Sequence, residues 1–223
     1  MEKSSLDKFW FLKNLDIYEG ISEAVLCRIA SSAYETTVPT GTQIYSPHKE
    51  DGNIYVLKRG EVVLYHSKDG KRAIFDTLEP GSVFGSFDPQ NLTPTHFAVT
   101  TRPTMLCVTP LNEFLKIISE HPEAMLRLMQ KMALRIHDYE QKIQNSTEGA
   151  TERIYNELER IQKKRQQSFL GKFLPIPLQI THETLAEHTN LNRVTVTRGL
   201  QQLKNEGLIR IESGTGVIHL AKV

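Results

Sequence analysis

The sequence is poor in cysteine, with Cys27 and Cys107 as its two thiols, and it contains no His-x-His or Cys-x-x-Cys pair. Two distant cysteines exclude a disulfide framework and the four thiolates of a usual iron–sulfur cluster. No apolar run approaches the roughly 18 residues of a membrane span. Residues 1–8 carry four charges and lack the apolar core of a signal peptide. We therefore expect a cytoplasmic protein with no membrane partner and no metal site.

Motifs of catalysis are also missing. The chain has no glycine-rich phosphate loop and no recognisable Ser/His/Asp arrangement. A cupin-type metalloenzyme would be a rival interpretation of a β-rich chain, but it needs a His-x-His pair with a downstream carboxylate and histidine. We expect no catalytic residues and no enzyme activity.

Charge is balanced overall but divided unevenly. Residues 151–223 carry eleven Lys or Arg and seven Asp or Glu, a net charge of +4, whereas residues 1–150 carry −3, which gives the +1 of the whole chain. A modestly positive domain suits binding to the phosphates of nucleic acid. The run Lys163-Lys164-Arg165 fits that use, or simply the soluble end of a helix.

Two short helices with a tight connection are predicted in the basic part. The first follows a cap at Thr181 or His182 and ends in an Asn-rich turn, and the second begins near Arg193. Apolar residues on helical spacing give both helices one buried side, formed by Leu185, Ala186, Val196, Leu200 and Leu203. This is the pattern of a helix-turn-helix.

The other side of the second helix is polar and faces outward. An arginine fork matches guanine or phosphate, and threonine offers a hydroxyl to phosphate and a methyl to thymine. A solvated amphipathic helix is the alternative for this segment taken alone. We expect DNA contacts from Thr181, His182, Asn192, Arg193, Val194, Thr195, Thr197, Arg198 and Gln201.

The neighbouring segments favour the DNA-binding interpretation. Gly207 follows the second helix as a stop signal, and the runs 208–211 and 217–220 flank a Ser-Gly-Thr-Gly turn, which predicts a hairpin. Residues 178–180 can add a strand, and residues 151–167 a charged helix. Residues 151–223 are therefore predicted to be a winged helix-turn-helix domain.

The N-terminal half has short β-rich runs separated by glycines, and Asp69-Gly70 is a strong hairpin signal. This pattern predicts a β-roll or jelly roll. A long helix follows Pro122, and its apolar residues recur in steps of three and four, as in a coiled-coil seam: Leu126, Met129, Ala133, Ile136 and Ile143. Packing against the chain's own barrel is the alternative. Glu140 also falls on this seam, where two copies of a carboxylate would face each other.

Several motifs occur in a fixed order: Pro39-x-Gly41, Tyr55-Val56-Leu57-x-x-Gly60-Glu61-Val62, Leu78-x-x-Gly81-x-x-Phe84-Gly85, the helix after Pro122, and the Arg193–Arg198 segment. In this order the chain resembles the Crp/Fnr family of bacterial regulators over most of its length. The resemblance implies an α+β fold with a β-roll sensor (1–120), a dimerisation helix and hinge (121–150) and the winged helix-turn-helix. It also implies a homodimer that binds palindromic promoter sites, usually as an activator in contact with RNA polymerase.

The sensor departs from the family's cyclic-nucleotide-binding members. Those members place a glutamate for the ribose after the Phe-Gly pair and an Arg-Ser-Ala or Arg-Thr-Ala triplet for the cyclic phosphate. Here Ser86 follows Gly85, and the triplet is His96-Phe97-Ala98. A cyclic phosphate needs charge-assisted hydrogen bonds, so we do not expect cyclic AMP to bind. The candidate effector pocket comprises Gly85, Ser86, Phe87, His96, Phe97, Tyr139 and Glu140.

Other sensor chemistries stay open. Eight histidines include possible haem ligands, although no second ligand is indicated. Aromatic residues such as Phe87 and Tyr139 fit an apolar ligand site or plain core. A regulator active without an effector and a haem- or small-molecule-sensing module therefore remain alternatives. The intact Arg193–Arg198 segment argues against a sensor module that has lost DNA binding.

Overall fold

A computed structural model describes residues 9–145, 147–167 and 177–221. The N-terminal charges among residues 1–8, on which the expectation about a signal peptide depends, lie outside the described residues. The chain divides into two compact units, Met1–Leu64 with Asp76–His137, and Tyr65–Phe75 with Asp138–Val223. Among the described residues, no helix is both long and apolar enough to cross a membrane.

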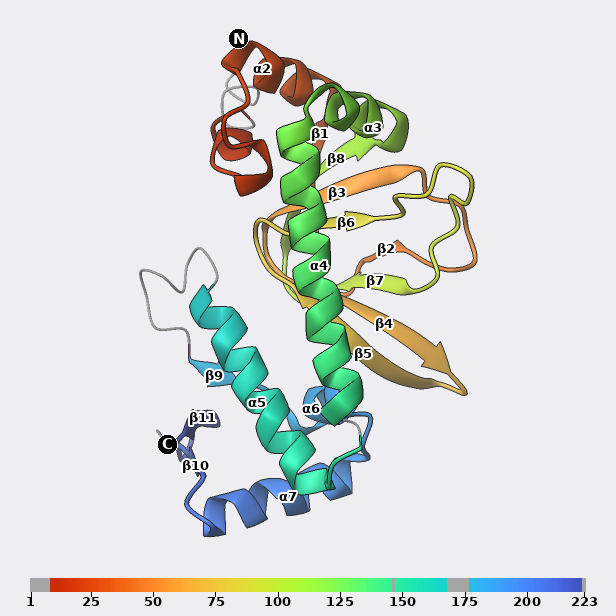
Figure 1. The fold of residues 1–223 in the computed structure, drawn as a ribbon. Helices are drawn as coiled ribbons and strands as arrows, with labels where there is room; N and C mark the ends of the chain where they lie inside the picture. The colour runs from red at the N-terminus through yellow and green to blue at the C-terminus, as the bar shows by residue number, and fades with distance from the viewer. Residues whose placement is uncertain (1–8, 146, 168–176, 222–223) are drawn as a thin grey trace. The chain divides into compact units, whose positions relative to one another are not determined.

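The N-terminal part is the predicted β-roll (Figure 1). Its eight strands form two four-stranded sheets in the orders β1-β8-β3-β6 and β2-β7-β4-β5. The strands are β1 (Tyr34–Val38), β2 (Gln43–Tyr45), β3 (Asn53–Arg59), β4 (Val62–Lys68), β5 (Lys71–Leu78), β6 (Val83–Gly85), β7 (Phe97–Thr100) and β8 (Thr104–Pro110). Asp69 and Gly70 both have positive φ, 51° and 75°, which confirms the predicted hairpin turn between β4 and β5.

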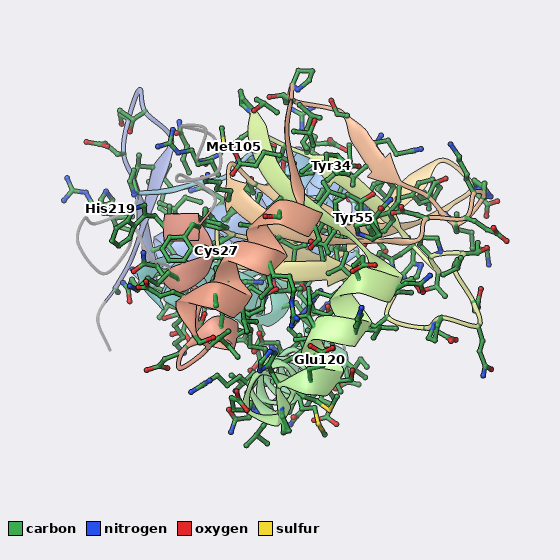
Figure 2. All side chains as sticks on the ribbon, turned by 90° about the horizontal axis from the view of Figure 1, so that it is seen from above. Cys27, Tyr34, Tyr55, Met105, Glu120 and His219 are labelled. Atoms are coloured by element: carbon green, nitrogen blue, oxygen red, sulfur yellow. The ribbon has the colours of Figure 1, made fainter. Side chains whose placement is uncertain are left out.

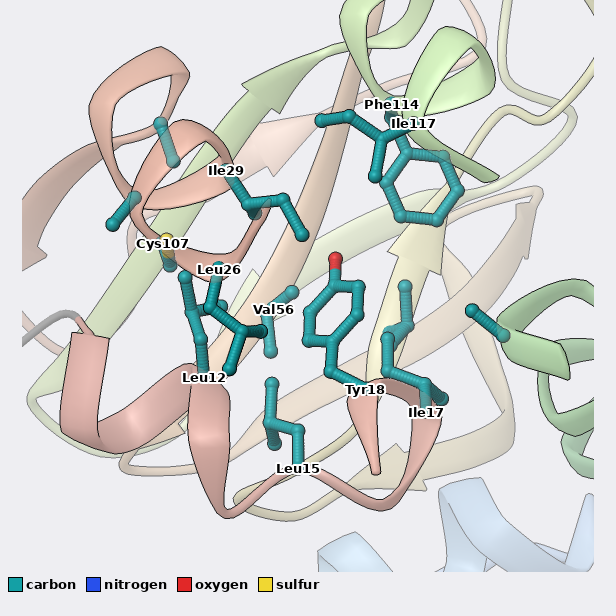
Figure 3. Close-up of a cluster of buried hydrophobic side chains, with 14 of the residues drawn as sticks. Leu12, Leu15, Ile17, Tyr18, Leu26, Ile29, Val56, Cys107, Phe114 and Ile117 are labelled. Atoms are coloured by element: carbon teal, nitrogen blue, oxygen red, sulfur yellow. The ribbon is translucent and has the colours of Figure 1, made fainter. Parts of the chain in front are cut away.

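A core of aliphatic and aromatic side chains joins this roll to the short helices that flank it. Those elements are η1 (Asp16–Tyr18), α2 (Glu23–Ser32) and α3 (Leu111–Glu120). Figure 3 shows Leu26 and Ile29 of α2 together with Val56 of β3 and Phe114 of α3. Burial raises the pKa of the neighbouring Tyr18 well above its ordinary value. The cluster is an ordinary apolar core.

The predicted long helix is α4 (Pro122–Asn145). The side chains assigned to its seam are exposed, with Ile136 at 57% and Ile143 at 69%, and so are Leu126, Met129 and Ala133. An exposed apolar row on a long helix is the pattern expected of a seam between two copies. Met125 and Leu134 are exposed as well, although the predicted seam does not include them.

The C-terminal part is a winged helix-turn-helix, as predicted. It contains α5 (Ala150–Gln167), β9 (Leu178–Gln179), α6 (His182–Thr189), α7 (Arg193–Asn205), β10 (Ile209–Ile211) and β11 (Val217–Leu220). The strands form an antiparallel sheet in the order β10-β11-β9. Figure 2 labels His219, which lies on β11 of this wing. The apolar faces of α5, α6 and α7 meet in one core.

Candidate nucleic-acid interface

Both helices of the helix-turn-helix have side-chain caps at their N-termini. Thr181 Oγ1 accepts a hydrogen bond from the backbone N–H of Thr184 at 3.0 Å, and Asn192 Oδ1 accepts one from that of Thr195 at 2.8 Å. Between the helices Asn190 has φ 52°, a left-handed conformation that asparagine tolerates better than most residues. The cap and turn residues predicted from the sequence are thus the ones that set the angle between α6 and α7.

The two faces of α7 differ as the spacing predicted. Val196, Leu200 and Leu203 are almost completely buried. The opposite face is exposed, with Val194 at 60% and with Arg193, Thr197, Arg198 and Gln201 in solvent. The buried stripe anchors the helix, so the exposed arginines project from a fixed support.

A hydrogen bond links the first residue of α6 to the second turn of α7 on the exposed side. His182 Nδ1 lies 2.9 Å from Thr197 Oγ1. Because Thr197 Oγ1 also lies 2.9 Å from the carbonyl oxygen of Arg193, its one proton goes there. The histidine must then be the donor in the first bond. His182, Thr197 and Arg193 therefore form one polar row along the candidate interface.

Helix α5 packs closely against the buried face of α7. A Cβ atom on Gly199 would lie 2.4 Å from Ile154 Cδ1, so only glycine fits there without a shift. This contact was not predicted from the sequence. A glycine inside an otherwise regular helix is the signal that indicates such a packing reason.

A buried polar cluster behind the turn was also missed. Glu157 on α5 is 6% exposed and receives two hydrogen bonds from Arg160, at 2.7 and 2.8 Å, and one involving His188 Nδ1 at 2.8 Å. The sequence does carry a signal for it. Glu157 lies three residues after Ile154 and four before Ile161, on the apolar stripe of α5, where an acid needs partners.

The candidate effector residues of the β-roll use their polar groups internally. Ser86 Oγ donates to the carbonyl oxygen of Asn91 at 3.0 Å. His96 Nε2 lies 2.9 Å from Tyr45 Oη, and the two rings meet edge to face at 5.4 Å. Gly85 has φ 131°, and a Cβ there would lie 2.5 Å from the carbonyl oxygen of Asn53. These contacts hold the segment to the sheet.

Three of the remaining pocket candidates make aromatic contacts. Phe87 packs against Phe114 of the core, with ring centroids 5.9 Å apart, and Phe97 meets His48 at 5.6 Å. Tyr139 and Glu140 belong to the second unit, where Tyr139 contacts Phe75 edge to face at 5.7 Å.

Tyr55, labelled in Figure 2, directs its hydroxyl to both carboxylate oxygens of Asp51, at 2.9 and 3.1 Å. Burial and the adjacent Asp51 carboxylate raise the pKa of Tyr55 well above its usual range. In the part of the chain that the structure describes, no three His, Cys, Asp or Glu side chains converge as metal ligands do.

A β-rich sensor-like part followed by a long helix and a winged helix-turn-helix defines a class of DNA-binding transcription regulator. Comparison with known proteins agrees. Residues 35–121 match the cyclic nucleotide-binding domain, and residues 152–222 match the Crp-like helix-turn-helix domain. The chain belongs to the Crp/Fnr family of transcription regulators.

Individual relatives are distant. The chain is 27% identical to the global nitrogen regulator of Synechocystis sp., covering 88% of this chain and 90% of that protein. It is 23% identical to the cAMP-activated global transcriptional regulator CRP of Salmonella typhimurium, covering 94% and 92%. Its fold is similar to that of the c-di-GMP-responsive global regulator CLP of Xanthomonas campestris, with a TM-score of 0.73 at 17% identity, covering 91% and 100%. The names of these relatives cite different signals.

Proposed function

We propose that the protein is a homodimeric regulator that reads palindromic promoter DNA and does not respond to cyclic AMP. The observation that carries the proposal is the two-sided α7, whose buried stripe fixes an exposed face bearing Arg193 and Arg198. A helix of this kind fits the major groove, with its N-terminal residues at the base edges.

Roles follow from position on α7. Arg198 reads guanine in each half-site, because its planar fork can donate to both acceptors of that base. Arg193, at the first turn, contacts a base or a phosphate. Val194 offers an apolar contact to a thymine methyl, whereas the commonest readers in the family place a glutamate at this step. Asn192, Thr195 and Gln201 help to position the helix, and Thr181 and His182 approach the backbone from α6.

The exposed seam of α4 supports the homodimer. A row of large apolar side chains in solvent is costly unless something covers it, and a second copy of the same helix is the partner that a heptad-like spacing fits. The seam then comprises Leu126, Met129, Ala133, Ile136 and Ile143. Glu140 is also exposed on α4. In a dimer its two copies would face each other, so the spacing of the two α4 helices would depend on the groups near these carboxylates.

The internal hydrogen bonds of Ser86 and His96 support independence from cyclic AMP, because neither side chain supplies the carboxylate or guanidinium that the nucleotide needs. A regulator active without an effector and a haem- or small-molecule sensor both fit this part of the proposal. The proposal further includes activation through RNA polymerase, a cytoplasmic location and no enzyme activity. The domain limits 1–120, 121–150 and 151–223 remain part of it.

Selection from random double-stranded DNA tests the proposal. The purified protein, without added ligand, should enrich a palindrome whose half-sites lie about one helical turn, roughly 34 Å, apart. Addition of cyclic AMP should leave the enriched sequence and its affinity unchanged. A single, non-repeated half-site would contradict the dimer, and enrichment of no sequence would contradict DNA reading itself.

A further inference from the structure

The buried cluster behind the helix-turn-helix turn has a geometry that points to a task in DNA recognition. On α5, Arg153 and Glu157 are four residues apart and so lie on the same face of the helix. Arg153 donates to the backbone carbonyl of Thr189, and Glu157 pairs with His188 at 2.8 Å. One face of α5 therefore holds two consecutive residues at the end of α6.

These two contacts sit directly before the recognition helix. Only residues 190–192 separate Thr189 from Arg193, the first residue of α7. Asn190 and Asn192 already have fixed conformations, as a left-handed turn residue and as a cap. Little freedom remains between the anchored Thr189 and α7, so a shift of the anchor would carry the start of α7 with it.

Two further basic side chains, one on α5 itself and one on α4, lie against the carboxylate of Glu157. Arg160 of α5 donates one hydrogen bond to each oxygen of this carboxylate. Lys142, in the last turn of α4, places Nζ 3.7 Å from Oε1 of Glu157. Lys142 Nζ also lies 3.3 Å from the backbone carbonyl oxygen of Ile74 on β5. The cluster thus links the end of α4, the β5 strand and the turn within one compact unit.

Near neutral pH, Glu157 and His188 each keep one charge state. Burial alone would raise the pKa of Glu157, but the hydrogen bonds from Arg160 and His188 and the charges of Arg160 and Lys142 hold it well below its usual range. Burial lowers the pKa of His188. A neutral His188 then donates its Nδ1–H to a permanently ionised carboxylate.

We propose that Glu157 is a positioning residue for DNA recognition: through His188, and beside Arg153, it fixes the turn that aims α7, and Lys142 ties this turn to the end of α4. The inference rests on the proposed DNA reading and adds to it a residue that does not face the interface. Simple stabilisation is the competing role, but buried ion pairs are weak evidence for that, since their desolvation offsets their attraction.

Lys142 makes the weakest contact of the cluster. Its distance to Glu157 exceeds a hydrogen bond, and a cavity of about 140 Å³ lined by Lys142, Arg153 and Glu157 lies beside them. A cavity of that size admits water, which can partly replace the ammonium group. We therefore expect Lys142→Gln to weaken operator binding less than Glu157→Gln does.

The experiment compares four variants of the full-length protein. Glu157→Gln keeps the shape of the side chain and removes its charge, and His188→Leu removes the donor. His188→Asn keeps an N–H donor near the Nδ1 position. Glu159→Gln is the matched control, because it makes the same charge change on α5 at a surface pair with Lys163. Each protein is titrated with its selected operator and with random DNA, and amide hydrogen exchange is followed along residues 188–195 and 208–220.

Glu157→Gln and His188→Leu should lose about tenfold or more in operator affinity, the loss that follows from unmaking a buried charge-assisted hydrogen bond, while affinity for random DNA changes less than about twofold. Exchange should quicken in residues 188–195 and not in the wing. His188→Asn should stay near the parent, and so should the control.

Operator affinity within about twofold of the parent for a folded Glu157→Gln or His188→Leu would overturn the proposal. Equal losses on operator and random DNA, with faster exchange throughout, would assign the cluster to stability and overturn it too. A parent protein that does not prefer its operator would instead contradict the proposed function. If Glu157→Gln does not fold, the test is the difference in operator affinity between His188→Leu and His188→Asn. Equal operator affinities of these two variants would contradict the positioning role.

Discussion

The recognition helix and the sensor segment of the β-roll treat their polar side chains in opposite ways. On α7 the guanidinium groups of Arg193 and Arg198 stand in solvent above a buried stripe. In the roll, Ser86 donates a hydrogen bond to Asn91 in the segment after β6, and His96 lies within hydrogen-bond distance of Tyr45 on β2. A surface that awaits a partner keeps donors exposed, and a closed one satisfies them internally. The recognition helix thus keeps its donors exposed, whereas the two polar side chains of the β-roll that stand at the family's nucleotide-binding positions are bonded within the chain.

Dissociation of the dimer should have the largest effect on DNA binding, because one α7 alone cannot read a palindrome. A glutamate at Ile136 would put like charges on the exposed seam of α4. We expect Ile136→Glu to be monomeric at micromolar concentration and to lose about a hundredfold or more in operator affinity, since the second half-site no longer adds to binding. Sedimentation and DNA titration measure the two effects.

The matched control for that variant is Leu134→Glu. Leu134 is 67% exposed on the same helix, but two residues away and so almost on the opposite side. It should leave the dimer intact. If Ile136→Glu remains a dimer, or if both variants dissociate equally, the seam has been placed on the wrong face.

Removal of one arginine from α7 tests a single proposed contact with DNA. Arg198→Ala should cost about 1 to 3 kcal/mol per half-site on the selected operator, because a guanine fork is lost. Binding to random DNA should weaken far less. Lys163→Ala, which removes an exposed cation from α5, is the control for charge alone. Equal losses on both DNAs would show that Arg198 holds only phosphate.

The sequence predicts some features of these two regions and misses others, and the difference has a physical reason. The capped helices, the buried stripe of α7 and the Asp69-Gly70 hairpin depend on local spacing and turn chemistry, so all were foreseen. The partners of Glu157 were not, because His188 and Lys142 come from other helices and meet it only after packing. Phe87 shows the same limit. Its aromatic character suited both a pocket and a core, and its contact with Phe114 comes from a distant segment of the chain.

The buried face of α7 can be tested at Gly199. A Cβ there would lie 2.4 Å from Ile154 Cδ1, so Gly199→Ala should destabilise the protein by about 1 to 2 kcal/mol through overpacking. Ile154→Val removes the clashing atom. In that background the same substitution should be neutral or stabilising, because alanine favours helix over glycine by up to about 1 kcal/mol. Thermal unfolding of the four proteins measures this, and equal effects in both backgrounds would contradict the close approach.

The smallest effect is expected when cyclic AMP is offered to the β-roll. Cyclic AMP at millimolar concentration should leave operator affinity unchanged, because Ser86 and His96 offer no carboxylate for the ribose and no guanidinium for the phosphate. The titration needs a positive control, so the double variant Ser86→Glu with His96→Arg is measured beside the parent. Calorimetry should detect no heat of binding for the parent. Binding by the parent would show that the β-roll holds the nucleotide through other groups, and the internal hydrogen bonds of Ser86 and His96 would then describe only the ligand-free form of a working sensor.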